Sequence, residues 1–169
     1  IDKGCATLDD IENGKDFFTA IAFLNAQSKS SKIEQFIRKK LEHNTVKTKD
    51  RGDGEKDRKF YEYKISTTNK DKQINALQIR LWQEVDYYLL GYIDEQQFEN
   101  SRLYLLPHDE MKKQCKLFNS ATHGTEKANE SNKTVEMSLR VKMKNDDALL
   151  LDFEKKFRAK DLEETIFNQ

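Results

Sequence analysis

Cysteine is scarce in this sequence, and its two copies, Cys5 and Cys115, stand far apart. Neither has partners at the spacing of a zinc site, so we interpret both as ordinary thiols of a cytoplasmic protein rather than as a disulfide. The sequence also contains no glycine-rich phosphate loop and no serine–histidine–aspartate spacing. These absences remove the support for a zinc module, a phosphate-loop enzyme or a serine hydrolase.

Long hydrophobic runs are missing as well. No apolar run approaches the length of a membrane span, and no signal peptide is visible. We therefore expect a cytoplasmic protein with no membrane partner. The first residue is Ile rather than Met, so the completeness of this end of the chain stays open.

An excess of charge of either sign is also lacking. The chain has 30 Lys and Arg residues against 30 Asp and Glu residues, and its formal net charge is zero. Charged residues nevertheless make up 36% of the chain, which predicts a surface dense in charge that can still be divided into positive and negative regions. A length of 169 residues predicts one domain that buries a core of its own.

The segment 53–66 carries the strongest functional signal. Its second half predicts a β-strand because it is rich in aromatic and β-branched residues, namely Phe60, Tyr61, Tyr63 and Ile65. On a strand, Glu62 and Lys64 project from the same face. The Gly-Asp-Gly before it predicts a turn, and the β-branched residues of 45–49 predict the partner strand that delivers Asp53. Two carboxylates and an ammonium group would then converge, which indicates a divalent-metal site for phosphodiester cleavage.

The spacing of an acid two residues before a lysine is not specific by itself. It occurs four times, at Asp57/Lys59, Glu62/Lys64, Glu110/Lys112 and Glu154/Lys156. Only Glu62/Lys64 lies in a strand-like run with another acid a hairpin's length upstream, whereas the last two pairs lie in predicted helices. The alternative interpretation is a cluster of cross-strand charges on a solvated sheet face.

At these residues the chain resembles a known superfamily. Asp53, followed by Glu62-Tyr63-Lys64 and Ile65-Ser66, is similar to the catalytic signature of the PD-(D/E)XK nucleases, above all the small Type II restriction endonucleases. The resemblance spans about residues 31–106, and Gly52 stands where that signature begins with proline. It implies an α/β fold with a restriction-endonuclease-like α-β-β-β-α-β core, in which helices flank a central mixed β-sheet. Residues 107–169 would form a C-terminal extension of the same domain.

The resemblance also implies an activity and a set of site residues. The protein would be a magnesium-dependent, sequence-specific endonuclease of double-stranded DNA. Asp53, Glu62 and the carbonyl of Tyr63 would hold Mg²⁺, and Lys64 would orient the attacking water. Glu34 is an accessory candidate for the metal, and Gln78 and Arg80 are candidates near the phosphate.

Partners and rival functions follow from the same resemblance. A double-strand cut by so small an enzyme implies a homodimer, and restriction systems add a companion DNA methyltransferase. One alternative is a repair, junction-resolving or transposon-type nuclease that recognises DNA structure. Another is a DNA-binding module without catalysis.

Hydrophobic periodicity predicts the remaining elements. We expect a helix over 15–24 and a second helix from Ser31, where Ser31 and Glu34 form a capping box that gives Glu34 a purely structural alternative role. A short helix over 75–84 would carry Gln78 and Arg80. Further on, we expect a strand over 86–93 buried on both faces, a strand over 102–106, a helix over 109–118, an amphipathic strand over 134–143 and a final helix from Asp146.

The polar segment 120–140 has no secondary-structure signal until its last residues. Long segments of this kind are often functional, and base recognition requires polar side chains that reach into a groove. We hypothesise that it contacts DNA, and an ordinary surface loop is the alternative. The candidate contacts are His123, Thr125, Lys127, Asn132 and Arg140.

Overall fold

The computed structural model describes residues 7–67, 71–118, 122–123, 136–143 and 147–168. The helices are α1 (Gly14–Ile21), α2 (Ala26–Leu41), α3 (His108–Leu117), α4 (Ala148–Phe157) and α5 (Lys160–Phe167). The strands are β1 (Gly54–Lys56), β2 (Lys59–Thr67), β3 (Gln73–Ile79), β4 (Tyr87–Ile93), β5 (Arg102–Pro107), β6 (Thr122–His123) and β7 (Glu136–Lys142).

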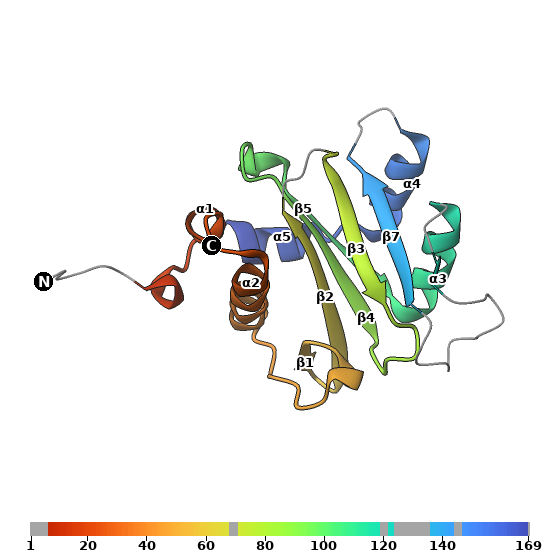
Figure 1. Ribbon diagram of the computed structural model, residues 1–169, viewed down its shortest axis with the longest axis horizontal. Helices are drawn as coiled ribbons and strands as arrows, with labels where there is room; N and C mark the ends of the chain where they lie inside the picture. Colours follow the sequence, from red (N-terminus) through yellow and green to blue (C-terminus); the bar gives the residue numbers. More distant parts are fainter. Residues whose placement is uncertain (1–6, 68–70, 119–121, 124–135, 144–146, 169) are drawn as a thin grey trace, which may run out of the picture.

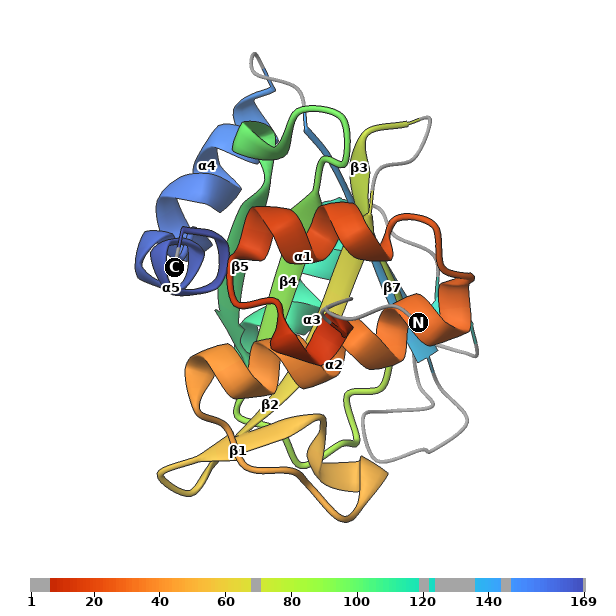
Figure 2. The same cartoon turned by 90° about the vertical axis from the view of Figure 1, so that its left-hand side faces the viewer.

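A mixed sheet of four strands, in the order β1-β2-β4-β5, forms the centre of the protein. Strands β2 and β4 are parallel, and the two outer pairs are antiparallel. Helices α1, α2 and α5 pack on one face of this sheet, as Figures 1 and 2 show. The other face packs against α3, α4 and a second, antiparallel sheet in the order β3-β7-β6. The expected mixed α/β fold, with helices flanking a mixed sheet, is therefore confirmed.

Strand β4 lies between two hydrophobic cores, which explains its near-continuous apolar sequence. Tyr88, Leu90 and Tyr92 face the second sheet, whereas Leu89 and Ile93 face the helices. Because successive side chains of a strand point to opposite faces, a strand covered on both faces needs apolar residues at every position. The prediction of a strand buried on both faces is confirmed.

The strand that pairs with β2 is β1, and the expectation of a partner strand over 45–49 was wrong. Asp57 and Arg58 have φ angles of 52° and 66°, so they form a tight turn of the kind that joins neighbouring strands directly. Because two residues suffice for this turn, the chain immediately before it pairs with β2, with Gly54 opposite Tyr61. The β-branched residues of 45–49 lie outside this hairpin and pair with no described strand, so their β propensity alone does not make them a strand.

Helix α2 begins earlier than expected. Asn25 is its N-cap, and the Asn25 side chain accepts a hydrogen bond from the Ser28 N–H at 2.9 Å. The predicted capping box of Ser31 and Glu34 was therefore wrong, because both residues lie inside the helix. A strong asparagine cap six residues upstream outcompeted it. Glu34 is consequently available for another role.

The segment expected to form a helix over 75–84 is instead strand β3, which pairs with β7. Its register shifts between Ala76 and Ile79, which marks a β-bulge. The helix was expected from the spacing of Ile74, Leu77 and Leu81, but Leu77 is 49% exposed, and the buried residues of the strand are Ile74, Ala76 and Ile79. Residues 80–86 form no helix, so the described residues do not contain the α-β-β-β-α-β order expected from the resemblance.

Most later elements agree with the sequence predictions. Strand β5, helix α3 and strand β7 lie at the expected positions, and the predicted final helix is two helices, α4 and α5. The polar segment contains the short strand β6, which pairs with β7.

Cys115 is buried and free, whereas Cys5 lies outside the described residues. Within the described ranges, no helix combines the length and the apolar character needed to cross a bilayer.

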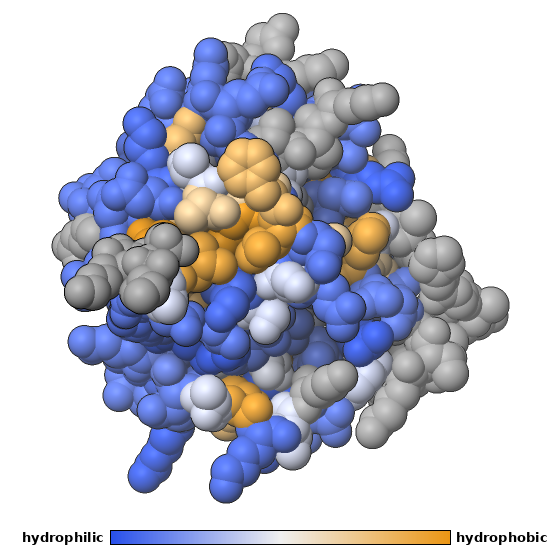
Figure 3. Space-filling model, turned by 60° about the vertical axis from the view of Figure 1, so that its left-hand side comes forward, coloured by the Kyte–Doolittle hydropathy of each residue, from blue (hydrophilic) through white to orange (hydrophobic). Residues whose placement is uncertain are grey.

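An apolar patch interrupts the charged surface near α1 and α2 (Figure 3). Figure 3 shows a patch of apolar side chains on this face, surrounded by hydrophilic residues. Phe23, just after α1, is 92% exposed, and a hollow of about 330 Å³ is lined in part by Leu8, Ile11, Phe17 and Phe36. Patches of this kind are typical of contact surfaces. This one lies on the opposite side of the central sheet from β3.

Candidate functional site

The β1–β2 hairpin fixes Asp53 beside the edge of β2. The Asp53 N–H donates to the Tyr61 carbonyl at 2.7 Å, and its Oδ2 accepts from the Tyr63 N–H at 2.8 Å. Arg38, on α2, donates to the Asp53 carbonyl at 3.0 Å. Asp53 is thus held through its amide, its carboxylate and its carbonyl, so its position is determined by both the hairpin and the helix.

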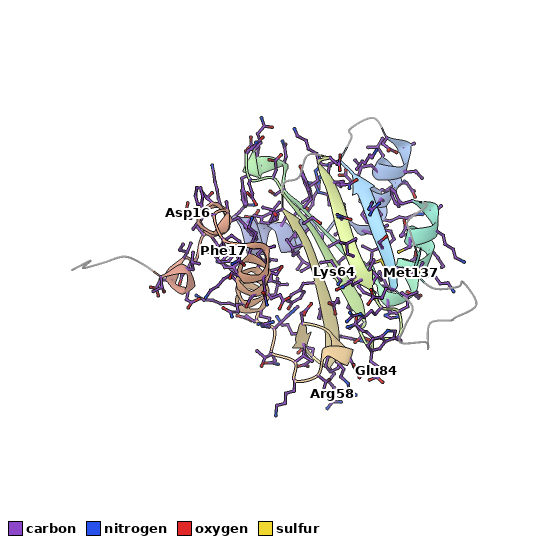
Figure 4. All side chains as sticks on the ribbon, in the orientation of Figure 1. Asp16, Phe17, Arg58, Lys64, Glu84 and Met137 are labelled. Carbon is purple, nitrogen blue, oxygen red and sulfur yellow. The ribbon has the colours of Figure 1, made fainter. Side chains whose placement is uncertain are left out.

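Glu62 and Lys64 project from the opposite face of β2 to α2, toward the second sheet. In the parallel ladder Glu62 pairs with Tyr88 and Lys64 with Leu90, and both partners belong to the core beneath that sheet. Glu62 is therefore only 9% exposed. The Lys64 Nζ lies 3.8 Å from Glu62 Oε1 and donates to the Gln78 carbonyl of β3 at 3.4 Å. Figure 4 shows Lys64 where β2 and β3 face each other.

The surroundings of the Glu62 carboxyl disfavour its ionised form. Burial, followed by the charge of Asp53, raises the pKa of Glu62 to about 8, and the Lys64 ammonium offsets only part of this increase. A hydrogen bond between the Glu62 and Asp53 side chains also favours the protonated form of Glu62. The two acids are therefore close enough to compete for charge, and a cation between them would relieve that competition.

Glu34 belongs to the same electrostatic cluster. Its pKa is raised by burial and by Asp53, and it is lowered by Arg38 and Lys64. Arg38 also lies one helical turn further along α2, 4.0 Å from Glu34. Glu34, on α2, therefore lies within electrostatic range of Asp53, Glu62 and Lys64. Because Glu62 is buried, these charges do not lie on the solvated sheet face of the alternative interpretation.

Metal ligation would depend on few protein groups. Among the residues that the structure describes, no group of three or more His, Cys, Asp and Glu side chains is arranged to hold a metal ion. The cluster offers the carboxylates of Asp53 and Glu62, with main-chain carbonyls of β2 beside them. Any ion bound here would retain water or substrate oxygens in its coordination shell.

The candidates for DNA contact lie apart from this cluster or outside the described residues. Arg80, just after β3, pairs with Glu136 at 3.0 Å, and Arg140 on β7 donates to the Asn75 side chain at 3.3 Å. Arg80 therefore does not lie on a helix as expected, whereas Arg140 lies on the strand predicted for it. His123 lies in β6, and its side chain is not described. The remaining candidates, Thr125, Lys127 and Asn132, lie outside the described residues.

Two contributors were missed by sequence reasoning. Arg38 holds the Asp53 main chain, and its spacing of four from Glu34 on a helix was the available signal. The Gln78 carbonyl contacts Lys64, and no side-chain pattern reports the position of a carbonyl.

Comparisons with known proteins give no identification. No model of a protein family matches the chain, and no curated protein sequence matches it either.

The protonation of Glu62 predicts a pH-dependent gain in stability for Glu62→Gln. Because the pKa of Glu62 is raised from 4.5 to about 8, the unfolded chain releases a proton in this pH range that the folded chain keeps. The free energy of unfolding should therefore fall as pH rises from about 4.5 to about 8. Glutamine imitates the protonated acid, so the variant should match the wild type near pH 4.5 and exceed it by about 2–4 kcal/mol near pH 8.

Urea unfolding between pH 4.5 and pH 8.5, with a chelator present, measures this difference. Glu12→Gln replaces an exposed glutamate and should shift stability by less than about 0.5 kcal/mol at each pH. An equal stability of wild type and Glu62→Gln at pH 8 would show that Glu62 is ionised without cost.

Proposed function

We propose that this protein is a magnesium-dependent endonuclease that hydrolyses DNA phosphodiester bonds, of the PD-(D/E)XK type and most similar to a Type II restriction endonuclease. The observation that carries the proposal is the convergence of Asp53, buried Glu62 and Lys64 at the edge of β2. In the resembled signature, the same three residue types at this spacing perform phosphodiester cleavage. Glu34 adds a fourth group of the expected kind.

The donor set suits Mg²⁺. This ion prefers oxygen ligands and is commonly held by one or two carboxylates together with water and substrate phosphate. Asp53 and Glu62 supply the two carboxylates, and the carbonyl of Tyr63, the residue directly after Glu62, is the main-chain candidate. The raised pKa of Glu62 supports the fit, because two acids that repel each other gain from a divalent cation.

Each residue then has a role in hydrolysis. A bound Mg²⁺ supplies a more acidic water and offsets negative charge on the phosphate. Lys64 orients the attacking water and stabilises the charge that develops on the phosphoryl oxygens. The water oxygen bonds to phosphorus, one ester P–O bond breaks, and the leaving oxygen takes up a proton. Arg38 keeps Asp53 in place through its carbonyl.

Double-stranded DNA would be bound by a symmetric homodimer, one active site for each strand. The second sheet borders the cluster through β3, and it carries Arg80 and Arg140. These arginines, with the polar segment 120–140, are the candidates for contacts to the duplex. A companion methyltransferase would protect the host sites in such a system.

Digestion of a defined plasmid tests the activity. With Mg²⁺, we expect discrete fragments whose mapped ends share one short sequence, and with excess chelator we expect intact plasmid. The same reactions with Ca²⁺ in place of Mg²⁺ provide a control for binding without cleavage, read by gel shift.

Two other outcomes would redirect the assignment. Cleavage only at branched or flapped DNA would favour the structure-specific nuclease. Shifted but uncut DNA under all metal conditions would favour a binding module and contradict the catalytic proposal.

A further inference from the structure

The backbone of β3 is strained beside Lys64. Among the residues that the structure describes, five non-glycine residues have positive φ angles: Glu42, Asp57, Arg58, Lys72 and Gln78. Glu42 ends α2, Asp57 and Arg58 form the hairpin turn, and Lys72 directly precedes β3. Gln78, with φ of 54°, is the one inside a strand. A left-handed conformation there is costly and is often associated with function.

The β-bulge reverses which residue faces the core. Ala76 pairs with Leu139, and regular antiparallel pairing would place residue 78 opposite Met137 with its side chain inward. Instead Ile79 pairs with Met137 and is fully buried, while the Gln78 side chain is exposed. The extra residue therefore directs the backbone of Gln78 away from a regular ladder, and the Gln78 carbonyl accepts a hydrogen bond from Lys64.

Lys64 is consequently held from two sides. Its ammonium lies 3.4 Å from the Gln78 carbonyl oxygen and 3.8 Å from Glu62 Oε1, and the side chain is 19% exposed. An ammonium has three donors. The carbonyl engages one and the carboxylate attracts another, which leaves the third for a substrate oxygen or an attacking water.

We propose that Gln78 is a positioning residue whose main-chain carbonyl, presented by the left-handed bulge, fixes the Lys64 ammonium beside Glu62. Its catalytic consequence rests on the proposed nuclease function. The exposed Gln78 side chain contributes nothing to this role. The backbone conformation at position 78, and not the expected contact of the Gln78 side chain with the phosphate, is what positions Lys64.

Substitutions that separate backbone from side chain test this role. Glycine and asparagine adopt positive φ readily, whereas β-branched residues do so only under strain. Gln78→Gly and Gln78→Asn should keep kcat within about threefold of wild type, and Gln78→Val should lower kcat by about 10–100-fold with little change in KM, because a displaced catalytic group loses its orientation. Leu77→Val, at the neighbouring exposed position of the bulge, is the matched control and should leave kcat unchanged.

A second readout does not require nuclease activity. Acetylation by acetic anhydride without DNA, mapped by mass spectrometry, should modify Lys64 several-fold faster in Gln78→Val than in wild type and leave the rate at exposed Lys59 unchanged. If wild type does not cleave DNA, the nuclease proposal fails, but this contrast still decides whether position 78 holds Lys64. If Gln78→Val does not fold, the milder Gln78→Thr replaces it.

Two results would overturn the inference. One is a folded Gln78→Val protein in which Lys64 is acetylated at the same rate as in wild type. The other is a decrease in kcat for Gln78→Gly and Gln78→Asn as large as the decrease for Gln78→Val, since this would assign the effect to the side chain.

Discussion

Lys64→Ala is expected to lower Mg²⁺-dependent DNA cleavage by about 10²–10³-fold, the usual cost of removing one group that stabilises developing charge. The fold should persist, because Lys64 lies at the border of β2 and β3 and contributes little to the apolar core. Rates of plasmid nicking under single-turnover conditions measure the effect. Circular dichroism confirms that the variant is folded.

The sequence itself provides a matched control for this substitution. Lys156 also follows an acid at a spacing of two, but it lies on α4 and pairs with Asp152 on the surface. Lys156→Ala should therefore cleave at the wild-type rate. Asp53→Asn, which retains an acceptor for the Tyr63 N–H, should lose cleavage as severely as Lys64→Ala. Wild-type cleavage by Lys64→Ala would refute the assignment of the site.

Gly52→Ala is expected to destabilise the protein by about 2–4 kcal/mol and to reduce cleavage further than the loss of folded protein explains. Gly52 has φ of 84°, and a Cβ there would lie 2.5 Å from the Tyr61 carbonyl oxygen. That oxygen accepts the hydrogen bond from the Asp53 N–H. A methyl group would therefore strain the backbone and push Asp53 away from Glu62. The same φ angle is incompatible with proline, which explains why the proline that begins the resembled signature would not fit here.

Urea unfolding and nicking assays measure the two effects of Gly52→Ala. Arg58→Gly is the matched control, because it places glycine at a position with φ of 66° in the hairpin turn and should maintain or raise stability. Equal stability of Gly52→Ala and wild type would show that the chain before β1 relaxes without moving Asp53.

Local patterns predicted elements wherever a single period covered the whole element. Strands β4 and β7 and helix α1 follow from apolar patterning, because periodicity or a continuous apolar run reports burial on one face or both. Strand β2 follows from its aromatic and β-branched residues. Predictions failed where two local signals competed. Ser31 and Glu34 matched a capping box, but Asn25 capped the helix earlier. Ile74, Leu77 and Leu81 matched a helical spacing, but pairing with β7 made this segment a strand.

The candidate site was partly predictable for the same reason. Glu62 and Lys64 share a face of β2 because they are two apart on a strand, and this follows from sequence alone. The approach of Asp53 was predicted, but through the wrong partner strand, since a turn at Asp57 and Arg58 depends on positive φ angles that neither residue type guarantees. The carbonyl of Gln78 had no sequence signal.

By itself, the sequence determined which residues could supply carboxylates and an ammonium group, and which face of β2 would carry them. The tertiary structure decided that this face is covered, so that Glu62 is buried beside Asp53 and its pKa is raised. It also decided that Arg38 of α2 holds the Asp53 main chain, that Glu34 lies within electrostatic range of this cluster, and that β3 brings the Gln78 carbonyl to Lys64. The physical reason is that side-chain direction depends on neighbours along the chain, whereas burial and charge interactions depend on segments far apart in the sequence.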